Sequence, residues 1–495
     1  MLENILMGFQ MLFTFENILA LIAGTVLGYF VGAMPGISAT IGMALLIPFT
    51  FGMNALPAII FLIAIYKASY VGDSIPGTLI NTPGGAAAAA TAIEGYPLCQ
   101  QGKAKKALGM TIWGSGAAAI LSAIMMIFLT LPVANFALSF GSPEYFLLAV
   151  MGLSVVAGLS KGNLLKGLII AAFGVFLTTI GMDPIGGGSR FVFSFYFLEG
   201  LPFIPAVIGL FAVSEIFIIM SKKSKEKEVS KLEGEGFTFE DFKQNWHAVI
   251  KGTVLGFFVG LVPAAGANII TWLAYNEAKR TARRPELFGK GSMEGIAATE
   301  ASGNSSCNGA MVPTLTLGIP GSSPLAVLMG ALMLHGVQPG PLLFERNPEI
   351  PYTIFATALV AAPVMIIVGL VGLRFFAMVT LVPKSIIGGL VLGMCALGAF
   401  AISNSMFGVW VAFIFGFVGY FLRQLNIPIP PLVLALVLGR MAESEFRRSM
   451  VMSGGSPMIF FERPIAIVII LLTVLMFTTP LLQNYLRKRK DKAAQ

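Results

Sequence analysis

Two segments that lie far apart in the chain, one in each half, carry nearly the same string. Gly24–Pro35 reads GTVLGYFVGAMP and Gly252–Pro263 reads GTVLGFFVGLVP, so ten of the twelve positions are identical or differ only by Tyr for Phe. Each copy lies in apolar sequence and ends at a proline. Apolar segments that are interrupted by Gly and Pro at matching points of two halves indicate the binding site of a membrane transporter.

A second pair of segments follows the first in the same order. Gly72–Gly84 (GDSIPGTLINTPG) and Gly309–Gly321 (GAMVPTLTLGIPG) share an internal proline and a terminal Pro-Gly, and their separation is slightly larger than that of the first pair. Two matches in one order indicate an internal duplication. The polar stretch Ser221–Asn245 separates the copies, so we predict a first membrane repeat over residues 1–220, a cytoplasmic linker over 221–245 and a second membrane repeat over 246–495.

The composition places the chain in a lipid bilayer. Of its 495 residues 56% are hydrophobic and only 11% are charged, whereas a soluble domain has roughly 25% charged residues. A membrane span needs about 20 apolar residues, and by this measure we expect roughly ten to twelve segments, some of them broken. The predicted class is an all-α polytopic membrane protein, with no cleavable signal at the N-terminus.

The charged and metal-binding residue types exclude several functions. The net charge of +8 comes from basic residues in short loops and near the C-terminus, as the positive-inside rule expects, so it does not indicate nucleic-acid binding. Cys99, Cys307 and Cys395 have no metal spacing, and His247 and His335 are too far apart in the sequence for a His-based metal site. We therefore expect no cofactor, no metal site and no catalytic residue.

Two of the apolar segments are predicted to form helical hairpins. Val249–Ala278 is too long for one span, is broken at Pro263, and has basic residues at both ends. If both ends are cytoplasmic, the segment enters the membrane and returns to the same side. Its twin, Asn17–Gly52, follows Glu3 and Glu16 and meets no Lys or Arg before Lys67. This opposite loop charge predicts that the two repeats have inverted topology.

The breaks are the predicted binding site. Non-helical backbone at membrane depth is tolerated only where protein or water covers it, so the Pro-Gly loops must line a cavity. The N–H groups that begin the following half-helices favour a carboxylate, and the carbonyls that end the preceding ones favour a cation such as Na⁺. The candidate substrate-binding residues are Pro35, Gly36, Ser38, Asn81, Thr82, Gly84, Gly85, Gly266, Asn268, Gly321, Ser322 and Ser323.

Ionisable and amide side chains in apolar sequence are the candidate cation-coupling residues, because charge at membrane depth is costly. They are Asp73, Glu300 and Asn304. Lys67 and Glu94 are weaker candidates, and a structural Lys67–Asp73 ion pair or a position near the interface is the alternative.

Several residues also have purely structural interpretations. Gly24, Gly28 and Gly32 are typical of close helix packing. Thr82 and Ser323 are candidate helix caps, and His335 is expected to form a structural hydrogen bond. Asp183 and Glu199 flank a glycine loop and are expected to be solvated. No nucleotide-binding string G-x-x-x-x-G-K-[ST] is present, so ATP is not expected to act on this chain directly.

Longer motifs resemble those of the large membrane subunit of the tripartite tricarboxylate transporter family, the TctA type. They are Gly24…Gly28…Gly32…Pro35-Gly36, Asn81–Gly84 with Thr91–Leu98, Gly102–Gly109, Glu294–Ala298, Glu300-Ala301, Leu315–Gly321 and Leu334–Phe344. The chain departs from the family at Asp73, at Pro263-Ala264 and at Ser302–Ser306.

The resemblance implies a permease of the bacterial inner membrane that works with a small membrane subunit and a periplasmic solute-binding protein. Its substrate would be a carboxylate, such as citrate or a related di- or aromatic acid, and Na⁺ or H⁺ would be the coupling ion. From the hairpins we expect alternating access by an elevator motion. A passive anion channel and, less favoured, an intramembrane enzyme remain the alternatives, and homo-oligomerisation stays open.

Overall fold

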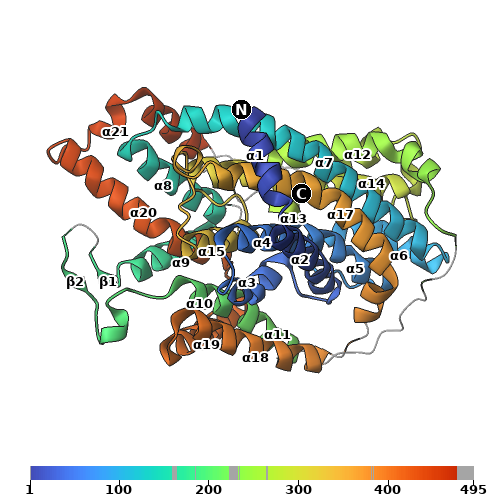
Figure 1. Cartoon of the computed structure of the whole chain (residues 1–495), viewed down its shortest axis with the longest axis horizontal. Helices are drawn as coiled ribbons and strands as arrows, with labels where there is room; N and C mark the ends of the chain where they lie inside the picture. Colours follow the sequence, from blue (N-terminus) through green and yellow to red (C-terminus); the bar gives the residue numbers. More distant parts are fainter. Residues whose placement is uncertain are drawn as a thin grey trace, which may run out of the picture. The chain divides into compact units, whose positions relative to one another are not determined.

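The computed structural model describes residues 2–158, 164–183, 186–221, 232, 235–263, 266–380, 382 and 384–475. These residues form mainly α-helices (Figure 1). The chain divides into two compact units, one made of Met1–Asn135 and Ile204–Tyr420 and the other of Phe136–Phe203 and Phe421–Gln495. Each unit therefore takes residues from both of the predicted repeats.

The first copy of the duplicated sequence builds six helices of the first unit. They are α1 (Leu2–Leu12), α2 (Phe15–Ala33), α3 (Ala39–Thr50), α4 (Ala55–Gly72), α5 (Ser74–Ile80) and α6 (Ala88–Gln100). The α2–α3 connection contains Gly36 at φ +88°, a conformation that glycine adopts without a steric penalty. Asn54, at the end of the turn after α3, donates a hydrogen bond to Glu16 at the start of α2 (3.5 Å). The chain thus returns to where it began, and α2 and α3 form a hairpin.

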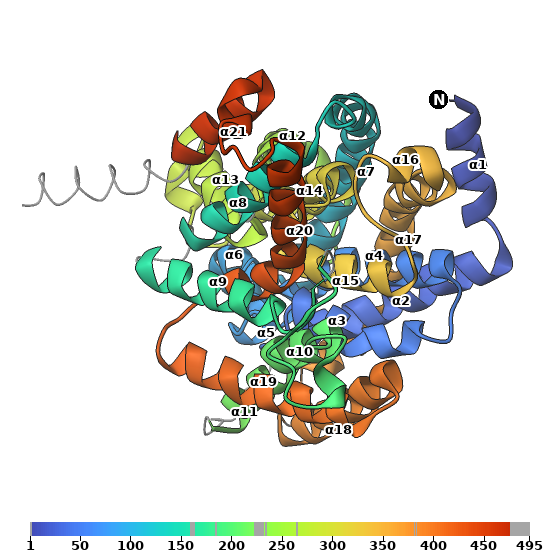
Figure 2. The same ribbon diagram turned by 90° about the vertical axis from the view of Figure 1, so that its left-hand side faces the viewer.

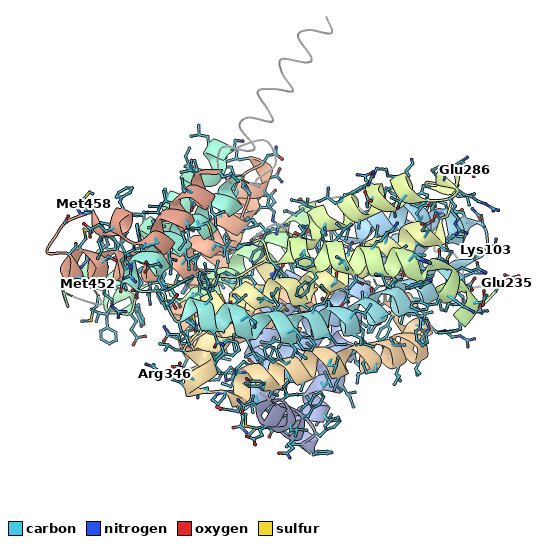
Figure 3. All side chains as sticks on the ribbon, turned by 90° about the horizontal axis from the view of Figure 1, so that it is seen from above. Lys103, Glu235, Glu286, Arg346, Met452 and Met458 are labelled. Atoms are coloured by element: carbon cyan, nitrogen blue, oxygen red, sulfur yellow. The ribbon has the colours of Figure 1, made fainter. Side chains whose placement is uncertain are left out.

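The second copy builds α12 (Phe239–Gly260), α13 (Gly266–Thr281), the short 3₁₀ helix η3 (Pro285–Leu287), α14 (Met293–Leu317) and α15 (Ser323–Leu334). Lys251 Nζ on α12 donates to Thr281 Oγ1 at the end of α13 (3.1 Å), so these two helices also form a hairpin. Its polar end lies with the other charged loops of this unit. Figure 3 shows Lys103, Glu235 and Glu286 gathered there.

A capping box fixes the start of α12. The Thr238 hydroxyl accepts from the N–H of Asp241, and the Asp241 carboxylate accepts from the N–H of Thr238. Lys106, near the start of helix α7 (Ala104–Ala137), forms an ion pair with Asp241 (2.8 Å). Partial burial raises the pKa of Asp241, but the hydrogen bonds from Lys106 and Thr238 outweigh it, so the pKa is lowered.

The two copies pack in the same way. A Cβ added to Gly24 would overlap the carbonyl oxygen of Phe61 on α4, and one added to Gly252 would overlap that of Ala298 on α14. In the same way, a Cβ on Gly28 would overlap the Ile65 carbonyl oxygen, and one on Gly256 would overlap that of Ser302. The third matching pair is Gly32 with Ser69 and Gly260 with Ser306. In all three cases the partner on α14 follows the corresponding partner on α4 by the same number of residues that separates Gly309 from Gly72. Gly72 and Gly309 begin the second pair of matching segments. The interpretation of these glycines as close-packing positions is confirmed.

The other helices of the first unit are long and apolar. They are α7 (Ala104–Ala137, whose last two residues lie in the second unit), α17 (Glu349–Val379), α18 (Lys384–Ser403) and α19 (Met406–Gln424, whose last four residues lie in the second unit), with the short α16 (Leu343–Arg346). α10 (Phe203–Ile208), the π-helical stretch η2 (Gly209–Val213) and α11 (Ser214–Ser221) follow one another, and α18 lies beside α11 (Figure 2). The uncharged apolar runs Ala107–Leu131 and Tyr352–Leu373 of the sequence fall within α7 and α17.

The second unit packs α20 (Pro430–Met452) against α8 (Ser142–Gly158) and α9 (Leu164–Thr178). It also contains the two-residue strands β1 (Gly181–Met182) and β2 (Ser189–Arg190), which pair antiparallel, the 3₁₀ turn η1 (Phe195–Phe197) and α21 (Ile459–Glu462).

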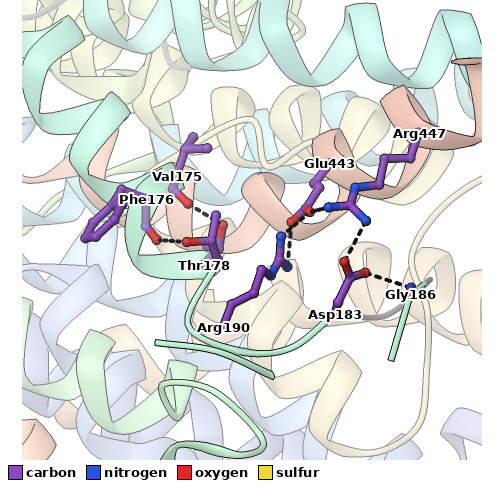
Figure 4. A network of polar contacts seen from close by, with 9 residues as sticks. Val175, Phe176, Thr178, Asp183, Gly186, Arg190, Glu443 and Arg447 are labelled. Atoms are coloured by element: carbon purple, nitrogen blue, oxygen red, sulfur yellow. Dashed lines mark hydrogen bonds and ion pairs between the residues drawn. The ribbon is translucent and has the colours of Figure 1, made fainter. Parts of the chain in front are cut away.

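The expectation that Asp183 is solvated is wrong. Its carboxylate forms an ion pair with Arg447 (2.6 Å), and Arg190 pairs with Glu443 (2.6 Å) (Figure 4). The Glu199 carbonyl accepts a hydrogen bond from Arg440 (2.9 Å). These contacts fasten the loop after α9 to the polar face of α20.

Six helices of the described residues are long and apolar enough to cross a membrane. They are Phe15–Ala33, Ala55–Ile80, Ala104–Ala137, Phe203–Ser221, Glu349–Val379 and Met406–Gln424. Five shorter apolar helices accompany them. This content agrees with the predicted all-α polytopic membrane protein. About half of the predicted linker, 222–231 and 233–234, lies outside the described residues, as does the chain after Leu475. The last part of the linker, residues 239–245, belongs to α12.

Candidate functional site

The four sequence breaks become four non-helical connections. Pro35 and Gly36 connect α2 to α3, and Ser38 is the residue before α3. Asn81, in the left-handed conformation (φ 49°), ends α5 and begins the loop that holds Thr82, Gly84 and Gly85. Gly266 begins α13 and Asn268 is exposed in its first turn, whereas Ala264 and Ala265 lie outside the described residues. Gly321 and Ser322 connect α14 to Ser323, the first residue of α15.

The loop after α5 folds back on Asp73. The Gly84 N–H donates to the Asp73 carbonyl (2.9 Å). A Cβ on Gly85 would overlap Asp73 Oδ2, so only glycine allows the backbone to lie this close. Asp73 is 2% exposed. The predicted cap at Thr82 is wrong, because α6 begins only at Ala88 and the Thr82 hydroxyl donates to the Ile80 carbonyl.

The second Pro-Gly loop is held by its neighbours. The Gly321 N–H donates to Thr314 Oγ1 (3.1 Å), and Ser322 Oγ lies 3.2 Å from the Tyr66 hydroxyl on α4. The residue before α15 is Ser322 rather than Ser323, so the predicted cap at Ser323 is also wrong. In the described part of the chain, neither Ser38 nor Ser322 caps its helix with a side-chain hydrogen bond.

Each Pro-Gly loop region of one repeat packs against a hairpin helix of the other repeat. Ala87, at the end of the loop after α5, packs with Ala267 and Ile270 of α13 in one small apolar cluster. α15 in turn packs on α3. Tyr66, beside Ser322, and Tyr70 lie one turn apart on α4, with ring centroids separated by 5.5 Å. The candidate residues thus form two groups along α4 rather than one cluster of four tips.

A small cavity lies where the loop after α5 meets α13, with room for about one water molecule. Glu300 of α14, 5% exposed, lines it. One carboxylate oxygen accepts hydrogen bonds from Ser74 (2.5 Å) and Thr91 (2.8 Å), and the other accepts from Ser115 (2.9 Å). The other lining residues are Tyr70, Ala87, Ala88, Thr271, Thr299, Gly303 and Asn304.

Glu300 and Asp73 have no cationic partner among the described residues. Lys67, 1% exposed, donates instead to Asn308 Oδ1 (3.0 Å) and to the Ala358 carbonyl (3.2 Å). The alternative of a Lys67–Asp73 ion pair is therefore wrong. Asp73 and Asn304 each keep one buried oxygen, Oδ1, without a hydrogen-bond partner in the part of the chain that is described.

Glu94 is a structural residue rather than part of this cavity. It is fully buried, and its carboxylate accepts from the Tyr275 hydroxyl (2.7 Å) and from the N–H groups of Gly289, Gly291 and Ser292 (2.5–2.8 Å). It fastens α6 to the loop between α13 and α14. His335 forms the structural hydrogen bond expected of it, to Thr50 Oγ1 (3.4 Å).

Sequence reasoning missed the hydroxyls around Glu300. Ser74, Thr91, Ser115 and Thr271 come from four different helices, and each looks like an ordinary small polar residue in its own segment. Ser74 carried the one usable signal, because it follows Asp73 at a break. No group of three or more His, Cys, Asp or Glu side chains that could hold a metal ion occurs among the described residues.

Comparison with known proteins identifies the family. The model of the tripartite tricarboxylate transporter TctA family matches residues 18–434. An uncharacterized 52.8 kDa protein in the TAR-I ttuC' 3' region of Agrobacterium vitis is 33% identical over 494 residues, which cover 99% of this chain and 98% of that protein. An uncharacterized protein in the TAR-II ttuC' 3' region of the same organism is 28% identical over 237 residues, or 48% of this chain and 98% of that protein. No solved structure matches the chain. The chain belongs to the tripartite tricarboxylate transporter TctA family.

Proposed function

We propose that the chain is the permease subunit of a binding-protein-dependent secondary transporter that imports a carboxylate together with a cation. The observation that carries this proposal is the buried Glu300 carboxylate, which lies beside a helix break and has hydroxyl partners but no basic one among the described residues. A buried charge without a counter-charge is costly, and such groups in membrane proteins mark ion pathways. Asp73 and Asn304, one on each repeat, would complete the cation-coupling set.

The carboxylate would bind at the helix breaks. A helix N-terminus presents unsatisfied N–H groups and a positive dipole end to an anion. Ser38 and Ser322 precede α3 and α15 without capping them in the described structure, so we infer that the first-turn N–H groups are open to a ligand, except at Pro324 of α15, which has no N–H. Citrate, succinate, tartrate and aromatic acids all fit this chemistry, so the substrate is proposed only as a class.

The proposed mechanism is alternating access. The two hairpins, α2–α3 and α12–α13, would be re-entrant and related by inverted topology, and they would carry the substrate against a static scaffold in an elevator motion. The family's tripartite character supports two partners, a small membrane subunit and a periplasmic solute-binding protein. The proposed location is the bacterial inner membrane.

The test is uptake by the reconstituted chain with its two candidate partners. Labelled citrate, succinate and tartrate are offered under an inward Na⁺ gradient, with and without the binding protein. We expect saturable uptake that requires the binding protein and stops when choline replaces external Na⁺. Flux that never saturates would instead indicate a passive channel, and recovery of a chemically altered solute would indicate an enzyme. Uptake that is unchanged in choline would contradict Na⁺ coupling.

A further inference from the structure

The oxygens around the Glu300 cavity form a potential ligand set. The described lining residues contribute the Glu300 carboxylate, the Asn304 amide oxygen and the hydroxyls of Ser74, Thr91, Thr271 and Thr299, besides Tyr70. All are hard oxygen donors, and the lining includes no sulfur or imidazole. Such a set suits hard cations rather than soft transition metals. The space for about one water molecule also suits an ion that has shed its hydration shell.

Two of these oxygens have no partner in the described structure. Asn304 Oδ1 and Thr271 Oγ1 are buried without a hydrogen bond, and their residues are 1% and 2% exposed. An unsatisfied buried polar group costs about 1–3 kcal/mol. Both residues line the same cavity although they belong to different helices, α14 and α13. Because both unsatisfied residues line one cavity, we infer that a ligand held there completes them.

The charge of the cavity sets the charge of the ligand. Glu300 is the one ionisable carboxylate that lines it, and no described basic side chain forms an ion pair with it. One monovalent cation would neutralise this carboxylate, whereas a divalent ion would leave one positive charge to be balanced by a carboxylate outside the cavity wall, such as Asp73. The hydroxyls of Ser74, Thr91 and Ser115 now donate to Glu300, and a hydroxyl can rotate to offer its lone pairs to an ion.

Both repeats line this cavity, and among the described residues the duplication does not generate a second site of this kind. The interval between the glycine partners on α4 and α14 also gives the residue of one repeat that corresponds to each cavity residue of the other. Glu300 corresponds to Ile63, Thr91 to Leu328 and Ser74 to Met311, and these three counterparts are buried and apolar. Gly303, which leaves space in the cavity, corresponds to the fully buried Tyr66, and Asn304 corresponds to Lys67. Large side chains, most of them apolar, therefore occupy the described positions that the duplication relates to the cavity lining.

We propose that the Glu300 cavity binds a single Na⁺-sized monovalent cation through Glu300, Asn304, Thr271 and the neighbouring hydroxyls, and that the duplicated fold holds only one such site. Its role as the coupling ion of transport depends on the proposed function, but its binding does not. The site goes beyond the three coupling residues expected from the sequence, since it adds Thr271 and the hydroxyl ligands and leaves Asp73 outside the cavity wall.

The experiment measures the melting temperature of the purified full chain as Na⁺ replaces choline at constant ionic strength. A ligand that binds only the folded state raises this temperature with its concentration. We expect stabilisation by Na⁺, with titration calorimetry giving about one ion per chain at a single saturable site. No stabilisation, stabilisation by Ca²⁺ but not by Na⁺, or two equivalent ions per chain would overturn the proposal.

Matched variants assign the site. Thr271→Val and Thr78→Val each remove a buried hydroxyl that has no partner among the described residues, but only Thr271 lines the cavity. We expect Thr271→Val to weaken Na⁺ binding about tenfold, Asn304→Ala to weaken it further, and Thr78→Val to leave the Na⁺-dependent increment unchanged. Equal increments in the two valine variants would overturn the assignment. Failure of uptake with these binding results intact would instead count against the proposed transport function alone.

Discussion

Two buried glutamates show how the partners of a carboxylate decide its role. Glu94 accepts from three backbone N–H groups and the Tyr275 hydroxyl, and a backbone N–H can only donate. Glu300 accepts from three hydroxyls, which are able to donate or accept. Glu94 is thus fixed as the anchor of a loop, whereas the surroundings of Glu300 are able to rearrange around a cation.

The anchoring role predicts a loss of stability in Glu94→Gln. The amide keeps the shape but has one acceptor oxygen in place of a charged pair, and hydrogen bonds to charged groups contribute about 1.5–3 kcal/mol each. We expect thermal unfolding in detergent to show a destabilisation of about 2–3 kcal/mol with the Na⁺-dependent increment preserved. The control is Glu294→Gln, since Glu294 lies in the first turn of α14, where a favourable dipole interaction typically contributes about 0.3–1 kcal/mol. Equal stability of the two variants would contradict the anchoring role.

At the scale of elements, rows of glycine hold each hairpin against its neighbouring helix. Gly28 lies against Ile65 and Ala68 of α4, and Gly256 lies against Ser302 and Ser305 of α14. Backbones that approach this closely gain van der Waals contact along a whole helix face. A methyl group at these positions would have to separate the helices, because the atoms that it meets include backbone carbonyls.

Gly28→Ala and Gly256→Ala are therefore expected to destabilise the protein by about 1–3 kcal/mol, the usual cost of overpacking. Gly389 on α18 is the control, since an added Cβ there meets no described atom within 4 Å. Gly389→Ala should be neutral or stabilise by up to about 1 kcal/mol through helix propensity. Melting temperatures of the three variants check the pattern, which would be refuted if all three behaved alike.

The hairpins and glycine rows could be predicted from the sequence because their signals are local. A proline break inside a long apolar segment and glycines at a spacing of four are both visible within a single segment. The Glu300 cage could not be predicted, because its hydroxyls come from α5, α6 and α7, and serine and threonine in apolar helices often bond to their own backbone. Thr130 and Ser122 do so with Met126 and Ala118. Only the tertiary arrangement separates these two uses of a hydroxyl.

For the whole molecule, the duplication preserves packing but not chemistry. The contacts of Gly24, Gly28 and Gly32 on α4 reappear for the matching glycines of α12 on α14, at one constant interval between the partner residues. Both hairpins lie in the same compact unit. The polar cavity nevertheless belongs to one side only, because Ile63 and Leu328 stand where the other side has Glu300 and Thr91. Duplicated packing thus supports an asymmetric site, and the proposed cation has no counterpart at the related position.

The proposed inverted topology of the two repeats can be tested by cysteine labelling. No Lys or Arg lies between Glu16 and Lys67, the stretch that contains Asn54 at the end of the first hairpin. The end of the second hairpin, by contrast, carries Lys279 and Arg280. Positive loops remain in the cytoplasm, so Asn54→Cys and Arg284→Cys should react with a membrane-impermeant thiol reagent from opposite sides. Both positions are exposed, whereas the native cysteines Cys99, Cys307 and Cys395 are buried. We therefore expect little background labelling of the native cysteines. Labelling of both sites from one side would mean that the repeats are parallel, and the proposed inversion of the two hairpins would then fail although their shared packing would stand.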